Sequence, residues 1–297
     1  MLGKLFKNEF AKTWKIAVLS FGCSVLMSIL VTVLLAIENS LGESAQLKST
    51  GEYIFDSLLN VLAVVGFISI AVIPVAFFVY LCIHFYKTMY STQGYLTHTL
   101  PASPVASFNV KLLVSVIWTI AGIAVMLITA LTIGLICSGA SLTELFGKEA
   151  REAISEGLRI INNELYPMFG VKFGDIIWLM VVSVVISIFS AYLFIFTALT
   201  IGQLSNTHKI GLAIGVGVGM SFAEKIIGGI FAVVITAKLF LTDRGVNFDS
   251  VNFGPESADF KGFFGGVMWT SFDLAIAMCL IQYVIDILIV RKHINLE

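Results

Sequence analysis

Four ionisable side chains lie inside long apolar stretches of this 297-residue sequence, and they are its strongest candidates for chemistry. They are Glu224, Lys225, Asp273 and Asp286. At the centre of a membrane-spanning helix an acid or a lysine costs about 2.5–3.5 kcal/mol, so such residues mark transport pathways, proton relays or contacts between helices. We therefore treat these four as pathway or interface residues. Asp286 shares a helix face with Gln282, four positions earlier, which favours a role in holding helices together.

The adjacent pair Glu224 and Lys225 sets the tightest energetic constraint. Thirteen Leu, Ile, Phe and Val residues between 210 and 235 return roughly 5 kcal/mol on insertion, against roughly 5–7 kcal/mol for the two charges. Since the gain from the apolar residues barely offsets the cost of the two charges, these side chains should not face lipid. They need a partner, a water-filled pathway or a helix break near Gly228-Gly229. Neighbouring helical residues point about 100° apart, so one contact cannot serve both equally. A structural pair with another helix and a pathway role both remain open.

The sequence contains no recognisable arrangement of catalytic residues. It has no GxxxxGK[ST], so it does not bind ATP through a P-loop of its own, and it has no HExxH. The four histidines lie far apart, and the four cysteines fall in or beside different apolar stretches without metal-site spacing. We predict that the chain is not an enzyme, that it holds no metal or cofactor, and that it has too few basic residues for a nucleic-acid surface.

Six apolar stretches carry these residues, and each meets or exceeds the ~20 residues that a helix needs to cross a hydrocarbon core of about 30 Å. They are 16–37, 58–84, 112–136, 176–204, 210–236 and 267–290. Lipid offers the backbone no hydrogen-bond partners, so these stretches must be helical. Only 12% of the residues are charged, against about 25% in soluble domains. The sequence predicts an all-α, polytopic membrane protein with a single transmembrane domain, 1–297.

The distribution of lysine and arginine predicts the orientation in the bilayer. One side has short segments dense in basic residues, including Lys4, Lys7, Lys12, Lys87 and Lys292. The three long loops of the other side spread eight basic residues among fourteen acids. Because loops rich in Lys and Arg stay inside, we expect both termini to be cytoplasmic.

Two segments outside the predicted spans are amphipathic. Residues 2–15 separate a basic half from an apolar half, which predicts a helix in the inner interface. This helix either anchors the first span or moves with a cytoplasmic partner. Residues 141–166 open on the capping pattern Ser-Leu-Thr-Glu and repeat apolar residues at three-to-four spacing, which predicts an extracellular helix. That helix covers the outer ends of the spans or serves as a lid.

Glycines recur every four residues in the fifth apolar stretch, at Gly211, Gly215 and Gly219. Small residues at this spacing let two membrane helices approach closely. We therefore expect a helix–helix contact along this face, not a phosphate-binding loop.

The connection between the second and third spans is about 25 residues long and too patterned for a simple turn. Within 86–107, Leu100 precedes Pro101, and the residue before a proline is pushed out of helical geometry, so a helix stops there. We expect a compact cytoplasmic element. Its exposed side chains would be Tyr90, Tyr95, Leu96 and Leu100.

This connection contains a pattern that resembles a known family. It reads Gln93-Gly94-Tyr95-Leu96-Thr97-His98-Thr99-Leu100-Pro101-Ala102-Ser103, which follows the form (Glu)-Gly-Tyr-Leu-x-x-x-Leu-Pro-x-Ser. With its basic amphipathic start and six spans, the chain resembles the ABC-2-type permease subunits of bacterial ABC exporters. The likeness covers the layout of essentially the whole chain, whereas the specific motif is this one stretch. Gln93 stands where related permeases commonly carry Glu, which leaves in doubt a charge contact to a partner at this point.

The resemblance implies that the 86–101 element is a coupling helix in a groove of a separate cytoplasmic ATPase. The implied contact residues are Tyr90, Gln93, Gly94, Tyr95, Leu96, Leu100 and Pro101. It also implies two permease copies, as a homodimer or with a paralogue, and two ATPase copies in a bacterial cytoplasmic membrane. ATP and Mg would be bound by the ATPase and not by this chain. The size and apolar interior resemble exporters of amphipathic membrane-active peptides, including phenol-soluble modulin and lantibiotic exporters.

Two other functions remain open from the residues. An ion-coupled secondary transporter would use Glu224, Asp273 or Asp286 and would run on a proton or sodium gradient without ATP. Many such transporters contain internal repeats, and none is evident here. A non-transport membrane protein, such as an immunity or sensor subunit, would show no flux.

Overall fold

The computed structural model describes residues 2–42, 50–91, 103–138, 147–169, 172–205, 208–242, 245–246 and 258–292. By their contacts these residues form two compact units, which we describe separately. The N-terminal unit comprises Met1–Lys87 and Ala106–Arg151, and the C-terminal unit comprises Thr88–Val105 and Glu152–Glu297. The regular structure is helical apart from one short antiparallel pair, β1 (Leu241–Thr242) with β2 (Gly245–Val246).

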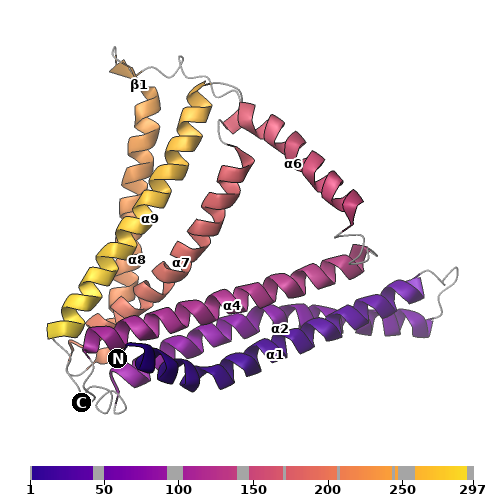
Figure 1. Ribbon diagram of the computed structural model, residues 1–297, viewed down its shortest axis with the longest axis horizontal. Helices are drawn as coiled ribbons and strands as arrows, with labels where there is room; N and C mark the ends of the chain where they lie inside the picture. Colours follow the sequence, from indigo (N-terminus) through magenta and orange to yellow (C-terminus); the bar gives the residue numbers. More distant parts are fainter. Residues whose placement is uncertain are drawn as a thin grey trace. The chain divides into compact units, whose positions relative to one another are not determined.

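Three long helices form the N-terminal unit: α1 (Leu2–Gly42), α2 (Thr50–Met89) and α4 (Pro104–Ser138) (Figure 1). The ring of Phe21 on α1 contacts Phe77 of α2 and Trp118 of α4, with centroids 5.5 and 5.9 Å apart. Farther along, one aliphatic side chain from each helix meets in a small core. That core is Val31, Ile70 and Ile133.

The C-terminal unit is built on α7 (Phe173–Gly202), α8 (Lys209–Phe240) and α9 (Ala258–Lys292), which contact one another pairwise (Figure 1). The turn from α7 to α8 requires a glycine. A Cβ built on Gly202 would lie 2.8 Å from the Lys209 carbonyl oxygen and 2.6 Å from the Ala213 Cβ. Because a backbone atom cannot move aside like a flexible side chain, the absence of a side chain at Gly202 allows this close crossing.

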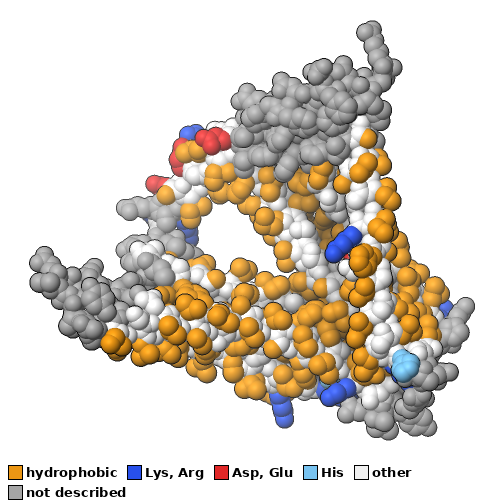
Figure 2. Space-filling model, turned by 180° about the vertical axis from the view of Figure 1, so that it is seen from behind, with side chains coloured by type: hydrophobic (Ala, Val, Ile, Leu, Met, Phe, Trp, Pro, Cys, Tyr) orange, Lys and Arg blue, Asp and Glu red, His pale blue; other side chains and the backbone are white. Residues whose placement is uncertain are grey.

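Six of these helices are long and apolar enough to cross a membrane, as the sequence predicted. Their apolar stretches lie within Leu2–Ile37, Ser57–Met89, Pro104–Leu135, Phe173–Gly202, Lys209–Ile235 and Gly265–Arg291. Hydrophobic side chains cover much of the visible surface of the helices (Figure 2). Large aliphatic residues such as Leu19, Leu127 and Val233 are each at least 65% exposed. A surface this apolar suits lipid rather than water.

The N-terminal amphipathic segment differs from its prediction. Residues 2–15 are not a separate helix, because α1 runs without interruption from Leu2 to Gly42. The third span likewise begins earlier than expected, since α4 starts at Pro104. Proline at the first helical position is favourable because its missing N–H has no partner there anyway. Lys111, one residue before the predicted stretch 112–136, therefore lies inside α4 and is buried.

The predicted extracellular helix is present in the described residues as α6 (Lys148–Phe169), whereas its expected start at 141–146 lies outside them. The helix ends two residues beyond Pro167, whose ring removes a backbone hydrogen bond to the preceding turn and so favours an end there. Charged side chains gather on its outer side in Figure 2, and the exposed Arg159 donates to Glu156. The apolar Ile154 and Leu158 are also exposed, so within the described chain α6 is not a packed cover.

The glycine stripe of α8 does not form the expected contact within the described part of the chain. A Cβ at Gly215 or Gly219 would meet no atom within 4 Å. Gly217, midway between them in the sequence, does face α7, with its Cβ position 3.8 Å from the Ala198 Cβ. The periodicity was correct for a helix, but the face that α8 turns to its neighbour is a different one.

Candidate functional site

The carboxylate of Glu224 is held by a neighbouring helix of the C-terminal unit. Gln282 on α9 donates from Nε2 to Glu224 Oε1 at 2.7 Å. Glu224 thus has the structural partner that the insertion cost demanded, and α8 continues as a helix past Gly228-Gly229. The partner is a neutral amide, which keeps the carboxylate oriented without neutralising its charge.

A cavity of about 450 Å³ lies beside Glu224, between α7, α8 and α9. Its apolar wall includes Phe231, Ile235, Leu274 and Met278. A volume of this size falls within the range of small-molecule sites, which are typically apolar pockets with a few polar groups. Glu224 is the charged residue among its lining residues.

Gln282 and Asp286 lie four residues apart on one face of α9, and both are buried. Asp286 is completely buried, and its Oδ2 accepts a hydrogen bond of 2.9 Å from the Thr197 hydroxyl of α7. Oδ1 of Asp286 and Oε1 of Gln282 have no hydrogen-bond partner within the described protein. Buried polar atoms left in this state are costly, so they favour a bound water or ion between the helices.

Tyr90 extends this polar chain to the end of α2. Its hydroxyl and that of Thr200 on α7 form a hydrogen bond of 2.7 Å, and Thr200 lies three residues along α7 from Thr197, the donor to Asp286. Burial raises the pKa of the Tyr90 phenol above its ordinary value, so the hydroxyl keeps its proton. The sequence led us to expect an exposed Tyr90, but only 4% of it is exposed because its ring packs into the C-terminal unit.

The other two predicted charged residues take no part in these polar contacts. Lys225 and Asp273 are both exposed, and neither forms a hydrogen bond or ion pair with any residue that the structure describes. Lys225 points away from Glu224's contact, as the 100° rotation between neighbours requires. The remaining predicted coupling residues lie outside the described residues. They are Gln93, Gly94, Tyr95, Leu96, Leu100 and Pro101.

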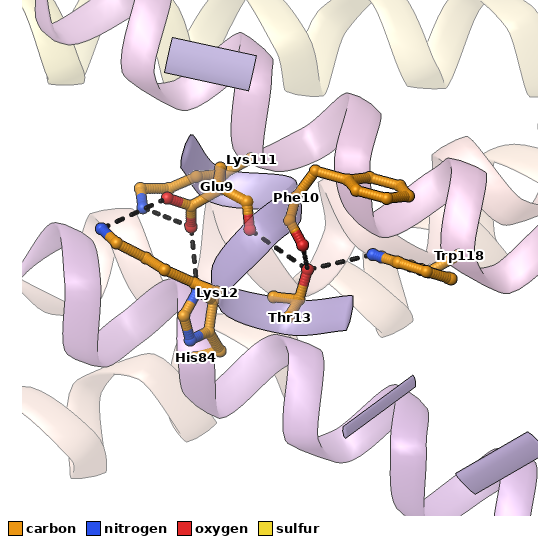
Figure 3. A network of polar contacts seen from close by, with 7 residues as sticks. All are labelled: Glu9, Phe10, Lys12, Thr13, His84, Lys111 and Trp118. Atoms are coloured by element: carbon orange, nitrogen blue, oxygen red, sulfur yellow. Dashed lines mark hydrogen bonds and ion pairs between the residues drawn. The ribbon is translucent and has the colours of Figure 1, made fainter. Parts of the chain in front are cut away.

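A second buried polar cluster lies in the N-terminal unit and was not predicted as a site (Figure 3). Glu9 Oε1 accepts from Lys111 Nζ at 2.8 Å and lies 2.9 Å from His84 Nε2. One turn along α1, the Thr13 hydroxyl accepts from the Trp118 indole at 3.0 Å. One signal pointed here: Glu9 falls on the apolar half of residues 2–15, where a charge requires a partner.

The two clusters differ in what they can do chemically. The Glu9 cluster is a compensated ion pair that ties α1 to α2 and α4. The Glu224 cluster comprises Glu224, Gln282, Asp286 and the adjacent cavity. It combines a carboxylate without a counter-charge with buried oxygen atoms that lack a described hydrogen-bond partner, so it can hold a cation, a proton or water. Among the residues that the structure describes, no three His, Cys, Asp or Glu side chains are grouped to hold a metal ion. No protein-family model, curated protein or solved structure matches this chain.

Proposed function

We propose that this chain is the membrane subunit of an ATP-driven exporter of the ABC-2 type. It would form the translocation pathway as a dimer, with a separate cytoplasmic ATPase supplying the energy. Six membrane-spanning helices support a transport role, and the lack of a P-loop in the sequence means that ATP would be bound elsewhere. Amphipathic or hydrophobic peptides are the cargo that suits the largely apolar cavity of the C-terminal unit.

The contact between Tyr90 and Thr200 is the observation that carries this proposal. Tyr90 stands at the start of the connection in which an ATPase would engage the chain. Its hydroxyl is bonded to α7, and Asp286 continues the linkage to α9 through Thr197. Both helices also line the cavity. A displacement of the connection would therefore be transmitted to the cavity wall through buried hydrogen bonds and side-chain packing.

Lys225 supports the presence of a second permease copy. An ammonium near the middle of a span costs about 2.5–3.5 kcal/mol when it faces lipid. Lys225 is exposed on α8, and nothing in the described chain covers it. A second copy, or a paralogue, that packs against this face would remove the ammonium from lipid.

The first test is purification of the chain with its ATPase from native membranes. The double variant Tyr95→Asp/Leu96→Asp places two charges in the connection. We expect a P-loop ATPase with measurable ATP hydrolysis to purify with the wild type and to be lost from this variant. The matched control is the charge swap Glu156→Lys/Arg159→Glu, because this exposed pair lies on α6, at the opposite membrane face in the predicted topology. Unchanged association of the double variant would contradict the proposed contact.

The second test is transport in proteoliposomes. With the ATPase present, labelled amphipathic peptide should accumulate only when ATP and Mg are supplied. Peptide movement by this chain alone, without ATP, would rule the proposal out.

An ion-coupled transporter is the second candidate, and one observation favours it. The Glu224 carboxyl accepts from Gln282 of α9, the Asp286 carboxyl accepts from Thr197 of α7, and Asp286 Oδ1 has no hydrogen-bond partner among the described residues. Proton or sodium relays use carboxylates in such surroundings. This candidate predicts that a pH or sodium gradient drives flux without ATP, and that Asp286→Asn abolishes that flux.

A further inference from the structure

We infer that the cavity beside Glu224 binds the ammonium group of a cationic amphiphile, with the apolar chain lying along α8 and α9. The inference deepens the proposed function by assigning a cargo chemistry to one site. It depends on that function only in treating the ligand as cargo. The geometry that supports it lies entirely within α7, α8 and α9 of the C-terminal unit.

The electrostatics of the cavity favour a cation. Glu224 Oε1 accepts from Gln282, whereas no described residue donates to Oε2. No basic side chain is among the described residues that line the cavity, and Lys225 points about 100° away around α8. A single carboxylate in an apolar cavity therefore has one acceptor oxygen available for a donor that the protein does not supply. An anionic ligand would meet only repulsion here.

Three hydroxyl groups line the wall, those of Ser190, Thr270 and Ser271. Thr270 donates to the Gly266 carbonyl oxygen, and Ser271 donates to the Val267 carbonyl oxygen at 2.6 Å. Because these two hydroxyls use their protons within α9, they can offer a ligand only an acceptor oxygen, which suits a cation. The cavity consequently offers one charged position, a few hydroxyl oxygens and an otherwise apolar surface.

This combination selects among cations. Divalent metal ions require several oxygen ligands, such as the six to eight of Ca²⁺, and Glu224 is the acid lining this cavity. A primary ammonium needs few acceptors, and an attached alkyl or apolar side chain would fill the remaining wall. Phe231, Ile235, Leu274 and Met278 would contact that apolar part. An N-terminal amine or a lysine of an amphipathic peptide has this chemistry, as does a simple alkylammonium.

The test uses the full chain in nanodiscs of zwitterionic lipid, with tritiated dodecylammonium as the charged probe. Tritiated dodecanol is the neutral probe of equal chain length, and empty nanodiscs give the lipid background. We expect saturable dodecylammonium binding that Glu224→Gln weakens about tenfold or more, since a hydrogen bond to a charged group is lost. Dodecanol binding should be unchanged by this variant. Glutamine keeps the size of the side chain and its contact with Gln282.

Two adjacent glycines of α8 offer a matched pair of positions, one lining the cavity and one outside it. A Cβ on either Gly228 or Gly229 would meet no atom within 4 Å, but only Gly228 lines the cavity. Gly228→Leu should reduce binding of both probes because the new side chain fills part of the cavity. The Gly229→Leu variant should bind both probes as tightly as the wild type does. Both variants gain helix propensity, so neither should unfold α8.

The outcomes distinguish this inference from the proposed function. Wild-type dodecylammonium affinity in Glu224→Gln, or in Gly228→Leu, would overturn the inference. An equal loss of both probes in Glu224→Gln would also overturn it, because the carboxylate would then shape the cavity rather than recognise charge. ATPase association should persist in Glu224→Gln, and dodecylammonium binding should persist in the Tyr95→Asp/Leu96→Asp chain. Loss of the ATPase alone would leave the binding site intact.

Discussion

Removing the negative charge of Glu9 should destabilise the N-terminal unit more than any surface substitution. Glu9 and Lys111 are 6% and 5% exposed, and their charged atoms are 2.8 Å apart. Glu9→Gln keeps the shape of the side chain and its ability to hydrogen-bond to His84. The variant therefore isolates the loss of the counter-charge of Lys111.

The magnitude follows from two opposing terms. At 2.8 Å and an effective dielectric constant of 20, the attraction is about 6 kcal/mol. Burying each ion costs several kcal/mol, so the intact pair contributes little net stability, whereas breaking it costs about 3–5 kcal/mol. We expect Glu9→Gln and Lys111→Met each to lower the free energy of unfolding by that amount. The double variant should lose at least about 3 kcal/mol less than the sum, because no charge is left buried alone.

The assay is SDS-induced unfolding in mixed micelles, followed by far-ultraviolet circular dichroism. Lys12→Met is the matched control, since Lys12 Nζ lies 3.9 Å from Glu9 Oε2 and its side chain is 48% exposed. Because the Lys12 ammonium is solvated and lies farther from the carboxylate than that of Lys111, its loss should cost only about 0–1 kcal/mol. Additive losses in the double variant, or a loss below about 1 kcal/mol in Glu9→Gln, would refute the reasoning.

Three further predictions, tested with four substitutions, probe the C-terminal unit by the same unfolding measurement. Gly202→Ala should lower the free energy of unfolding by about 1–3 kcal/mol, because its methyl group would press on the Lys209 carbonyl. Gly215→Ala, whose methyl group would lie in open space, should leave this free energy unchanged or raise it by up to about 1 kcal/mol. An equal effect of the two alanines would count against the close turn. Thr197→Val removes a donor to the buried α9 carboxyl and should cost about 1.5–3 kcal/mol, and wild-type stability would show that this bond is not formed. Tyr90→Phe should cost about 0.5–1.5 kcal/mol and should uncouple ATP hydrolysis from peptide flux in the reconstituted complex, whereas normal coupling would argue against the mechanical linkage.

The membrane-spanning helices could be predicted from the sequence because length and apolar content alone decide them. The predicted stretches 16–37 and 58–84 both fall within spanning helices of the structure, α1 and α2. The predicted ends of the helices were less accurate, because hydropathy detects only the apolar part of a helix and not its continuation into polar sequence. α1 extends back to Leu2 for this reason, and its polar first turns are accommodated by contacts with α2 and α4.

The contacts between helices could not be predicted, because periodicity gives the faces of a helix and not its neighbours. Glu9 is separated from His84 by 75 residues and from Lys111 by 102. Its place on an apolar half indicated a need for a partner, yet several other helices offered one. The same ambiguity explains the glycine stripe of α8, where Gly217 rather than Gly215 faces α7.

The position of Glu224 resolves the insertion energy that the sequence left nearly balanced. If both charges faced lipid, their insertion would cost roughly 5–7 kcal/mol, whereas the apolar residues of the helix return roughly 5 kcal/mol. In the structure Glu224 is turned towards Gln282 and the cavity, so of these two charges only that of Lys225 remains exposed. The remaining cost of about 2.5–3.5 kcal/mol is smaller than the return, and the helix inserts favourably without a second chain. A second copy is therefore not needed to insert α8, and its contribution would be to relieve the exposed ammonium after insertion. A Lys225→Leu variant should consequently insert as the wild type does while changing the strength of pairing, and impaired insertion of that variant would contradict this division of roles.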